Sequence, residues 1–270
     1  MSVCLVAMFK NEEHILNEFV THYLKQGIDR FYFIDNGSTD NWKDAIQPFV
    51  DKVHVFTDAT RNVQPILYNK YYLNECKKYD WVIVADLDEF IYARKGFSTI
   101  KDYLGTLDES ISNVFVQWKM FGSNGYLDQP KNVVQSFTKR LNYDKKNGFQ
   151  GITFHNGIKY GFHKSIARTR YVVRLDVHSI HTTNKFITSD NCTIEGAPYG
   201  FSLIDEQILQ NSCLNLNHYC IQSYNWFMKV KKTRGDGCSV NNDNVRNENY
   251  FNSFDAVCND IDDYELRDLV

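Results

Sequence analysis

The sequence predicts a mixed α/β fold built on a mainly parallel β-sheet. Over residues 2–90, short apolar runs alternate with stretches whose apolar residues recur at helical spacing, which is the pattern of successive strand–helix–strand units. The chain has 270 residues and is 43% hydrophobic, enough for one large core. Since no repeat or Pro/Gly-rich linker divides it, we expect one domain over residues 1–240 followed by an acidic segment, 241–270.

Each element of the first ninety residues has its own local signal. Buried apolar runs predict strands over residues 3–8, 31–34, 53–56 and 81–85. Apolar residues on one face predict helices over residues 11–26, 42–49 and 64–78. Gly27 stands at the expected end of the first helix, and the polar turn 35–40 offers side-chain oxygens that can cap the second.

Beyond residue 90 the alternation weakens, and a smaller region of loops and antiparallel strands is expected up to residue 183. We predict a helix over 98–107, a strand over 114–121, and a helix over 223–233 that ends at Arg234-Gly235. In the acidic segment, apolar residues at roughly helical spacing predict a terminal helix. These residues are Phe251, Phe254, Val257, Ile261 and Leu266.

Composition narrows the classes of partner and compartment. A formal charge of −3 gives no broad footprint for nucleic acid or an anionic membrane. Seven cysteines without a CxxC pair indicate neither a zinc site nor a disulfide framework. No leader pattern precedes the first strand, so we expect a cytoplasmic protein. No apolar stretch is long enough for a transmembrane segment, which leaves peripheral membrane contact open.

The most informative short motif is Asp86-Leu87-Asp88, which directly follows an apolar strand. Ligands of open parallel sheets bind where the carboxyl ends of the strands converge, and polar loops follow the first two strands as well. In an extended segment, Asp86 and Asp88 would project to the same side and share one hard cation, Mn²⁺ or Mg²⁺. An isolated motif of this kind is more often an acidic turn, but its place after a buried strand favours a cation that bridges a diphosphate.

Several motifs follow one another in order along residues 10–235. They are Lys10-Asn11-Glu12, the turn 35–40, residues 81–90 (WVIVADLDEF), residues 118–123 (WKMFGS), Lys164-Ser165-Ile166, Asn217-His218-Tyr219, and then Ser223, Phe227, Lys229 and Arg234-Gly235. This ordered series resembles the GT-A glycosyltransferases of the family 2-like and family 92 groups. Residues 182–210 contain no motif of this group, and we expect acceptor recognition or lid closure there.

The resemblance implies a Rossmann-like GT-A fold with helices on both faces of the sheet, a nucleotide-binding half over residues 1–90 and an acceptor-side half over residues 91–240. It implies metal-dependent transfer of a sugar from a nucleoside-diphosphate donor, with a UDP-hexose expected, to a glycan hydroxyl with inversion. The implied donor-site residues are Ala7, Phe9, Lys10, Asn11, Asp35, Arg61, Gln64, Asn69, Asp86 and Leu87. The implied metal ligands are Asp86, Asp88 and His218.

Two histidines three residues apart leave an alternative open. On a strand, His178 and His181 would point to opposite faces, so only one is expected in the site. The family pattern favours His178 as a donor-binding residue, while a structural role is equally open for either.

Transfer to a hydroxyl needs a base near the acceptor, and the sequence does not identify it. Asp128 is our first candidate, with Glu89 and Asp205 behind it. Trp118 and Phe121 are candidate acceptor-stacking rings, and core burial is an equally good interpretation of both.

Two other functions stay open at this point. A sugar nucleotidyltransferase would need a glycine-rich loop after the first strand, and residues 8–12 contain no glycine. A catalytically inactive glycan- or nucleotide-binding module would have no need for a buried charged cluster, which the intact Asp86, Asp88 and His218 predict.

Overall fold

The computed structural model describes residues 1–145, 152–155, 158–191, 200–242 and 244–270. Part of the 182–210 segment therefore lies outside the described residues, and the prediction of a lid there stays a prediction. None of the helices among the described residues is long and apolar enough to cross a membrane.

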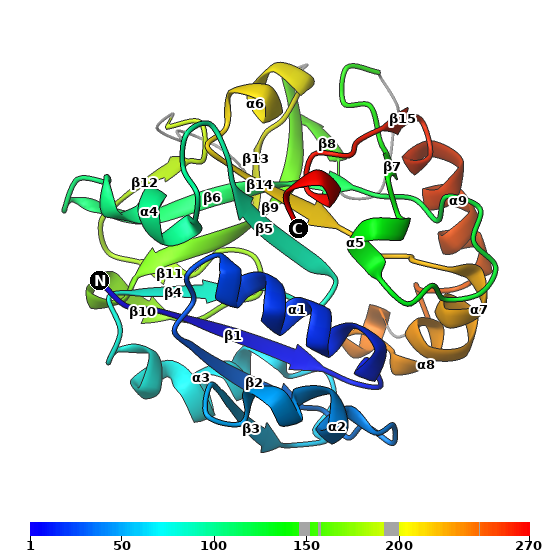
Figure 1. The fold of residues 1–270 in the computed structure, drawn as a ribbon, viewed down its shortest axis with the longest axis horizontal. Helices are drawn as coiled ribbons and strands as arrows, with labels where there is room; N and C mark the ends of the chain where they lie inside the picture. Colours follow the sequence, from blue (N-terminus) through cyan, green and yellow to red (C-terminus); the bar gives the residue numbers. More distant parts are fainter. Residues whose placement is uncertain (146–151, 156–157, 192–199, 243) are drawn as a thin grey trace.

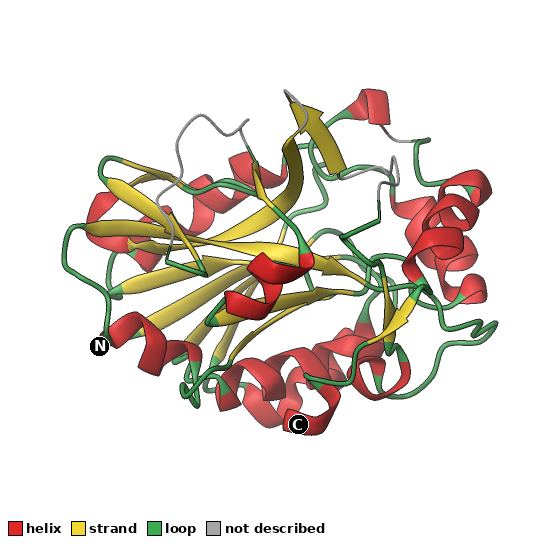
Figure 2. Ribbon diagram, turned by 90° about the horizontal axis from the view of Figure 1, so that it is seen from above, coloured by secondary structure: helices red, strands yellow, loops and turns green. Residues whose placement is uncertain are grey.

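The first half of the chain forms a parallel sheet with helices on both faces, as the resemblance implied (Figures 1 and 2). Its strands lie side by side in the order β3 (Val53–Thr57), β2 (Arg30–Asp35), β1 (Val3–Phe9) and β4 (Trp81–Val84). They alternate in sequence with α1 (Glu13–Lys25), α2 (Trp42–Ile46), the 3₁₀ turn η1 (Gln47–Phe49) and α3 (Gln64–Cys76). The predicted helices and strands of this half are confirmed, with ends that differ by one to two residues in most cases.

Burial explains why β1 is apolar throughout. Leu5 packs with the side chains of α1 and α2 on one face, while Val6 packs with those of α3 on the other. Both side chains are fully buried. A strand covered on both faces has no solvent side, so it shows a continuous apolar run in place of alternation.

The second half extends the same sheet. Next to β4 lie β9 (Ile158–Arg168), β6 (Ile111–Met120), β14 (Leu214–His218) and β5 (Glu89–Ala93), and β12 (Lys185–Thr188), β8 (Ile152–His155) and β13 (Phe201–Leu203) pair with β6 or β9. Only β9 and β5 run against the other described strands of this sheet. The sheet is therefore mainly parallel in direction, with its antiparallel pairs in the second half, as predicted.

Strand β5 was not predicted, because β4 and β5 read as one segment in the sequence. Four strand intervals separate β4 from β5 in the sheet order, about 19 Å in a flat sheet. Only residues 85–88 connect them, and this linker folds back through a hydrogen bond from Glu89 N to Asp86 O of 3.0 Å. The sheet must curl so that its last strand returns to the end of β4.

The remaining elements surround this sheet. They are α4 (Ile100–Gly105), α5 (Val133–Ser136), β7 (Lys139–Arg140), the 3₁₀ turn η2 (Thr169–Tyr171), β10 (Val172–Arg174), β11 (His181–Thr182), α6 (Glu206–Asn211), α7 (Tyr224–Trp226), η3 (Phe227–Lys231), α8 (Lys232–Arg234), the 3₁₀ turn η4 (Val240–Asn242), α9 (Glu248–Cys258), β15 (Ile261–Asp262) and the 3₁₀ turn η5 (Arg267–Leu269). The predicted helix over 223–233 is formed by α7, η3 and α8 together, and η3 is a π-helical turn.

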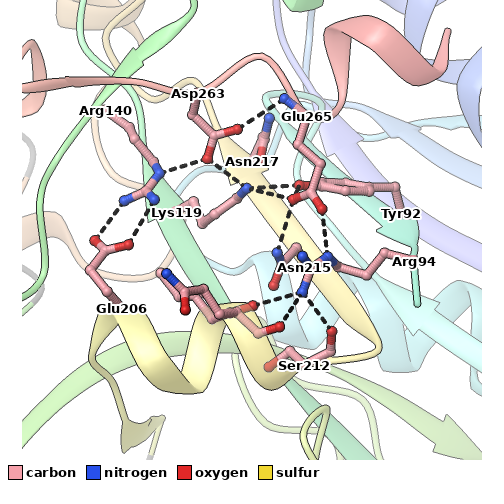
Figure 3. Close-up of polar contacts among 12 residues, drawn as sticks. Tyr92, Arg94, Lys119, Arg140, Glu206, Ser212, Asn215, Asn217, Asp263 and Glu265 are labelled. Carbon is pink, nitrogen blue, oxygen red and sulfur yellow. Dashed lines mark hydrogen bonds and ion pairs between the residues drawn. The ribbon is translucent and has the colours of Figure 1, made fainter.

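The acidic C-terminal segment is helical only in its first part, so the prediction of one helix as far as Leu266 is wrong. Phe251 and Phe254 face inwards from α9, but β15 follows and pairs with β7. Asp263 and Glu265 then join an ionic network with Lys119 of β6, and Asn215 of β14 also bonds to Glu265 (Figure 3). Lys119 Nζ lies 2.8 Å from Asp263 Oδ2, and Arg140 Nε donates to the same oxygen at 2.6 Å. The segment is therefore part of the folded core.

Candidate active site

The acidic turn between β4 and β5 forms the centre of the candidate site, at the carboxyl ends of the parallel strands. Leu87 is 1% exposed and anchors the turn in the core, so its side chain cannot reach a donor. Asp86 N donates to Glu89 Oε2 at 2.9 Å, and Tyr219 N donates to Asp88 O at 2.8 Å. These bonds fix the turn to itself and to the end of β14.

Asp86 is held by two protein donors. Lys164, on β9, donates to Asp86 Oδ2 at 2.8 Å, and Gln64 Nε2 donates to Asp86 Oδ1 at 3.0 Å. Burial opposes ionisation of this carboxyl, but the Lys164 ammonium outweighs it and the pKa of Asp86 is lowered. Both oxygens of Asp86 are thus engaged within the protein.

Asp88, Glu89 and His218 form the set that can hold a cation. Each offers one ligand atom, and these atoms all lie within 4.8 Å of one another. His218 Nε2 is 3.5 Å from Asp88 Oδ1 and 4.0 Å from Glu89 Oε1. Burial raises the pKa of Glu89, and its Oε1 has no hydrogen-bond partner among the described residues. Two carboxylate oxygens and one imidazole nitrogen with an orphaned acceptor suit a divalent cation such as Mn²⁺ or Mg²⁺.

This set differs from the predicted one, because Glu89 takes the place of Asp86. The prediction assumed that Asp86 and Asp88 lie in an extended segment. Leu87 and Asp88 instead form a turn, so the side chains of Asp86 and Asp88 do not alternate as they would on a strand.

Asp88 has a second neighbour that was not predicted. Lys231, in η3, donates to Asp88 Oδ2, and the two side chains are 7% and 5% exposed. Burial opposes ionisation of Asp88, but Lys231 and His218 more than compensate and lower its pKa well below the ordinary value. Asp88 therefore stays charged in a buried position.

An aromatic wall stands beside the cation set. The ring of Trp118 lies 4.2 Å from that of His218 and 5.3 Å from that of His178, and Phe162 stacks on His178 at 4.9 Å. His178 lies at a bend of the chain and not on a strand, and burial lowers its pKa to about 4. His181 is on β11, where it contacts Asp176 at 3.4 Å. The structure thus brings His178, and not His181, to the wall.

The predicted acceptor ring Phe121 is a core residue. It has no exposed surface and packs on Tyr219 at 4.9 Å, so it cannot stack on a sugar. Trp118 is partly exposed and lies in the wall described above. Its indole Nε1 has no hydrogen-bond partner among the described residues.

The predicted donor residues fall into two groups. Asp35 accepts from Ser38 N at 2.7 Å, and Asn11 Oδ1 accepts from Thr39 N at 2.7 Å, so both order the loops at the strand ends. Gln64 contacts Asp86, Lys10 offers its carbonyl oxygen to Arg234, and Arg61 is exposed after β3.

Three donor predictions instead fall on structural residues. Ala7 and Phe9 are buried in the core, and Phe9 packs on Trp42 at 5.3 Å. Asn69 bonds the backbone of Leu175 at both ends of its amide, with Nδ2 at 2.8 Å and Oδ1 at 2.9 Å. Side-chain contacts from these residues to a donor are therefore not supported.

The structure gives the three candidate bases different roles. Asp205 caps α6 by accepting from Ile208 N at 2.7 Å, and Glu89 belongs to the cation set. Asp128 is exposed and accepts from Asn225 Nδ2 at 2.7 Å.

Sequence reasoning missed the buried cations. Lys164 was part of a motif but had no role assigned, and Lys231 was not singled out among the neighbouring Lys229 and Lys232. Lys231 is buried while the other two are exposed. We call the edge of the sheet at the carboxyl ends of its parallel strands the rim. Regular helical spacing could have indicated which lysine faces this rim, but the π-helical turn changes the spacing.

Comparison with known proteins gives the family. A family model, glycosyltransferase family 92, matches residues 1–197. A family 92 protein of Oryza sativa subsp. japonica is 24% identical over 149 residues, which are 52% of this chain and 25% of that protein. One of Ricinus communis is 25% identical over 149 residues, 52% of this chain and 26% of that protein. The chain thus spans about a quarter of the length of these curated relatives.

Two solved structures show partial similarity. They are a Mycobacterium tuberculosis glucosyl-3-phosphoglycerate synthase in complex with Mn²⁺ and UDP (TM-score 0.31, 16% identity, 44% of each chain) and a mannosyltransferase of S. cerevisiae (TM-score 0.31, 12% identity, 63% of this chain and 56% of that one). The family model is the stronger finding because it covers well over half of the sequence. The chain belongs to glycosyltransferase family 92.

Proposed function

We propose that this chain transfers a sugar from a nucleoside-diphosphate donor, a UDP-hexose, to a hydroxyl of a glycan, with a divalent cation and with inversion at the anomeric carbon. Family membership supports sugar transfer in general. The observation that carries the finer proposal is the set of Asp88, Glu89 and His218, whose ligand atoms lie within 4.8 Å of one another at the rim of the sheet.

Asp88, Glu89 and His218 would hold the cation. When bound, Mn²⁺ or Mg²⁺ supplies positive charge that neutralises the diphosphate as it leaves. Asp86 keeps Lys164 in place beside this set. Lys164 Nζ lies 2.8 Å from Asp86 Oδ2 and 3.2 Å from Glu89 Oε2. The loops ordered by Asn11 and Asp35 border the same rim and are the proposed place for the nucleoside.

Trp118 is the proposed acceptor-side ring, since it is partly exposed next to His218. Asp128 is the proposed base for the acceptor hydroxyl. It is exposed and bonded to Asn225, at the start of the helical segment that carries Lys231. A carboxylate can serve this role if it lies within hydrogen-bond reach of the hydroxyl.

The experiment is a screen of nucleotide-sugars for UDP release with Mn²⁺, with Mg²⁺ and after chelation. We expect metal-dependent release from one or more UDP-sugars, and its loss in Asp88→Asn with an unchanged circular dichroism spectrum. Asp268→Asn, an exposed carboxylate near the C-terminus, is the matched control. The proposal fails if calorimetry shows that neither UDP nor any UDP-sugar binds with Mn²⁺ present; glycan binding without UDP release would indicate a binding module instead.

A further inference from the structure

The end of the π-helical turn and the residues after it lie against the rim of the sheet. Residues 231–239, which we call the rim segment, contact the connections that follow three parallel strands. Lys231 pairs with Asp88 after β4, and Arg234 pairs with Glu12 after β1. Gly237 O accepts from the N–H of Gln64, the first residue of α3, at 2.9 Å. Gly235, with φ of 76°, forms the bend where helix α8 ends.

The rim segment brings two cations to the site, Lys231, which is buried, and Arg234, which is partly buried. Arg234 lies 2.6 Å from Glu12 Oε2, and its side chain is 12% exposed. It also donates to Lys10 O at 3.0 Å. Both Lys231 and Arg234 lie near the ring of Trp226, at 6.0 and 5.6 Å from its centroid. Replacing a whole buried ion pair by apolar residues is often neutral for stability, so stability alone does not account for the presence of both cations here.

Lys231 and the proposed cation share one carboxylate. Lys231 binds Asp88 Oδ2, while Asp88 Oδ1 faces His218 at 3.5 Å in the cation set. A divalent ion on Oδ1 would lie close to the Lys231 ammonium in a buried environment, where repulsion between like charges is strong. An arriving diphosphate would remove this repulsion, because its negative charges offset the positive charges of the ion and of Lys231.

We propose that Lys231 and Arg234 are phosphate-binding groups of the donor site, held by Asp88 and Glu12 until the donor's diphosphate takes over as their partner. This inference rests on the proposed function, since it needs a nucleoside diphosphate at the rim. Its ligand class is the diphosphate with its divalent ion. Its consequence is that metal and nucleotide bind cooperatively through Lys231: the lysine disfavours the ion alone and favours the ion together with the diphosphate.

The test is the binding of Mn²⁺ alone and of UDP with saturating Mn²⁺, by titration calorimetry and by the electron paramagnetic resonance signal of free Mn²⁺. In Lys231→Met we expect Mn²⁺ alone to bind about tenfold more tightly and UDP about tenfold more weakly than in the wild type. Lys232→Met, the exposed neighbour, should match the wild type in both. Lys231→Arg should recover most of the UDP affinity, because it keeps the charge.

These opposite changes distinguish the proposal from a structural role, which would weaken both ligands or neither. If Lys231→Met is too unstable for titration, the shift of its melting temperature by Mn²⁺ replaces the first measurement and should exceed the wild-type shift. If the wild type binds both ligands and Lys231→Met has the same affinities as Lys232→Met, this inference alone is overturned. A wild type that binds neither ligand would overturn the proposed function as well.

Discussion

The Lys164 ammonium lies 2.8 Å from Asp86 Oδ2, although 78 residues separate the two in sequence. The same nitrogen is 3.2 Å from Glu89 Oε2 and donates to Val177 O at 2.9 Å. Lys164 has no exposed surface, and its carboxylate partners raise its pKa against the effect of burial. This one side chain from β9 thus compensates two acidic groups of the turn that ends β4.

Replacing Lys164 by Met should destabilise the fold by about 3–5 kcal/mol, because a buried carboxylate loses its partner. Urea unfolding measures this, with exposed Lys139→Met as the control. Adding Asp86→Asn should recover part of the loss, since it removes the uncompensated charge. Simple additivity of the two changes would contradict this account of the pair.

Glu89→Gln should weaken Mn²⁺ binding at least about tenfold, whereas Asp86→Asn should leave it within about twofold. The reason is that Glu89 Oε1 belongs to the cation set, while both Asp86 oxygens are bonded to Gln64 and Lys164. Titration of Mn²⁺ without nucleotide separates the two variants. The opposite ranking would restore the set that the sequence motif predicted.

Sequence patterns predicted the parts of the site that depend on strand order. Apolar runs followed by polar residues located Asp35 and Asp88 at one edge, because the carboxyl ends of parallel strands must converge. The exchange of Asp86 for Glu89 depends on a turn in place of an extended segment, which local sequence does not distinguish. The burial of Lys231 depends on a π-helical turn, and that of Phe121 on tertiary packing. Such features arise from contacts between segments far apart in the chain.

Stability should fall as the pH is lowered from 7.5 to 5.0. His22 is buried and its Nε2 lies 2.7 Å from Ile91 O, and burial lowers its pKa to about 4. An unfolded histidine titrates near 6.5, so the stabilisation is present above about pH 6.5 and is lost as the pH falls towards 4. Between pH 7.5 and pH 5.0, His22 should account for a loss of about 2 kcal/mol in the free energy of unfolding.

Urea unfolding at both pH values tests this loss. His22→Gln can still donate to Ile91 O and should reduce the pH dependence, although His163, with a pKa lowered to about 3, keeps part of it. Exposed His54→Gln should retain the wild-type dependence. An unchanged dependence in His22→Gln would show that His22 is not among the groups responsible.

Asp263→Asn should cost about 3 kcal/mol, because Lys119 and Arg140 both lose the carboxylate that they share (Figure 3). Lys119 and Arg140 hold the pKa of Asp263 at about 2 against the effect of burial. Guanidinium unfolding measures the cost, with exposed Asp268→Asn as the control. Equal stability of the two variants would mean that the C-terminal network contributes little.

The short connection from β4 to β5 has a consequence for how this site tolerates change. Asp88 and Glu89 lie on a tether that joins the middle of the sheet to its last strand, so the spacing of their oxygens is set by the closure of the whole sheet. An extra residue inserted after Asp88 would let that closure relax, and the three ligand atoms would separate even with every side chain retained. The length of the 85–88 connection is therefore constrained by the path of the sheet, independently of the chemistry of its side chains.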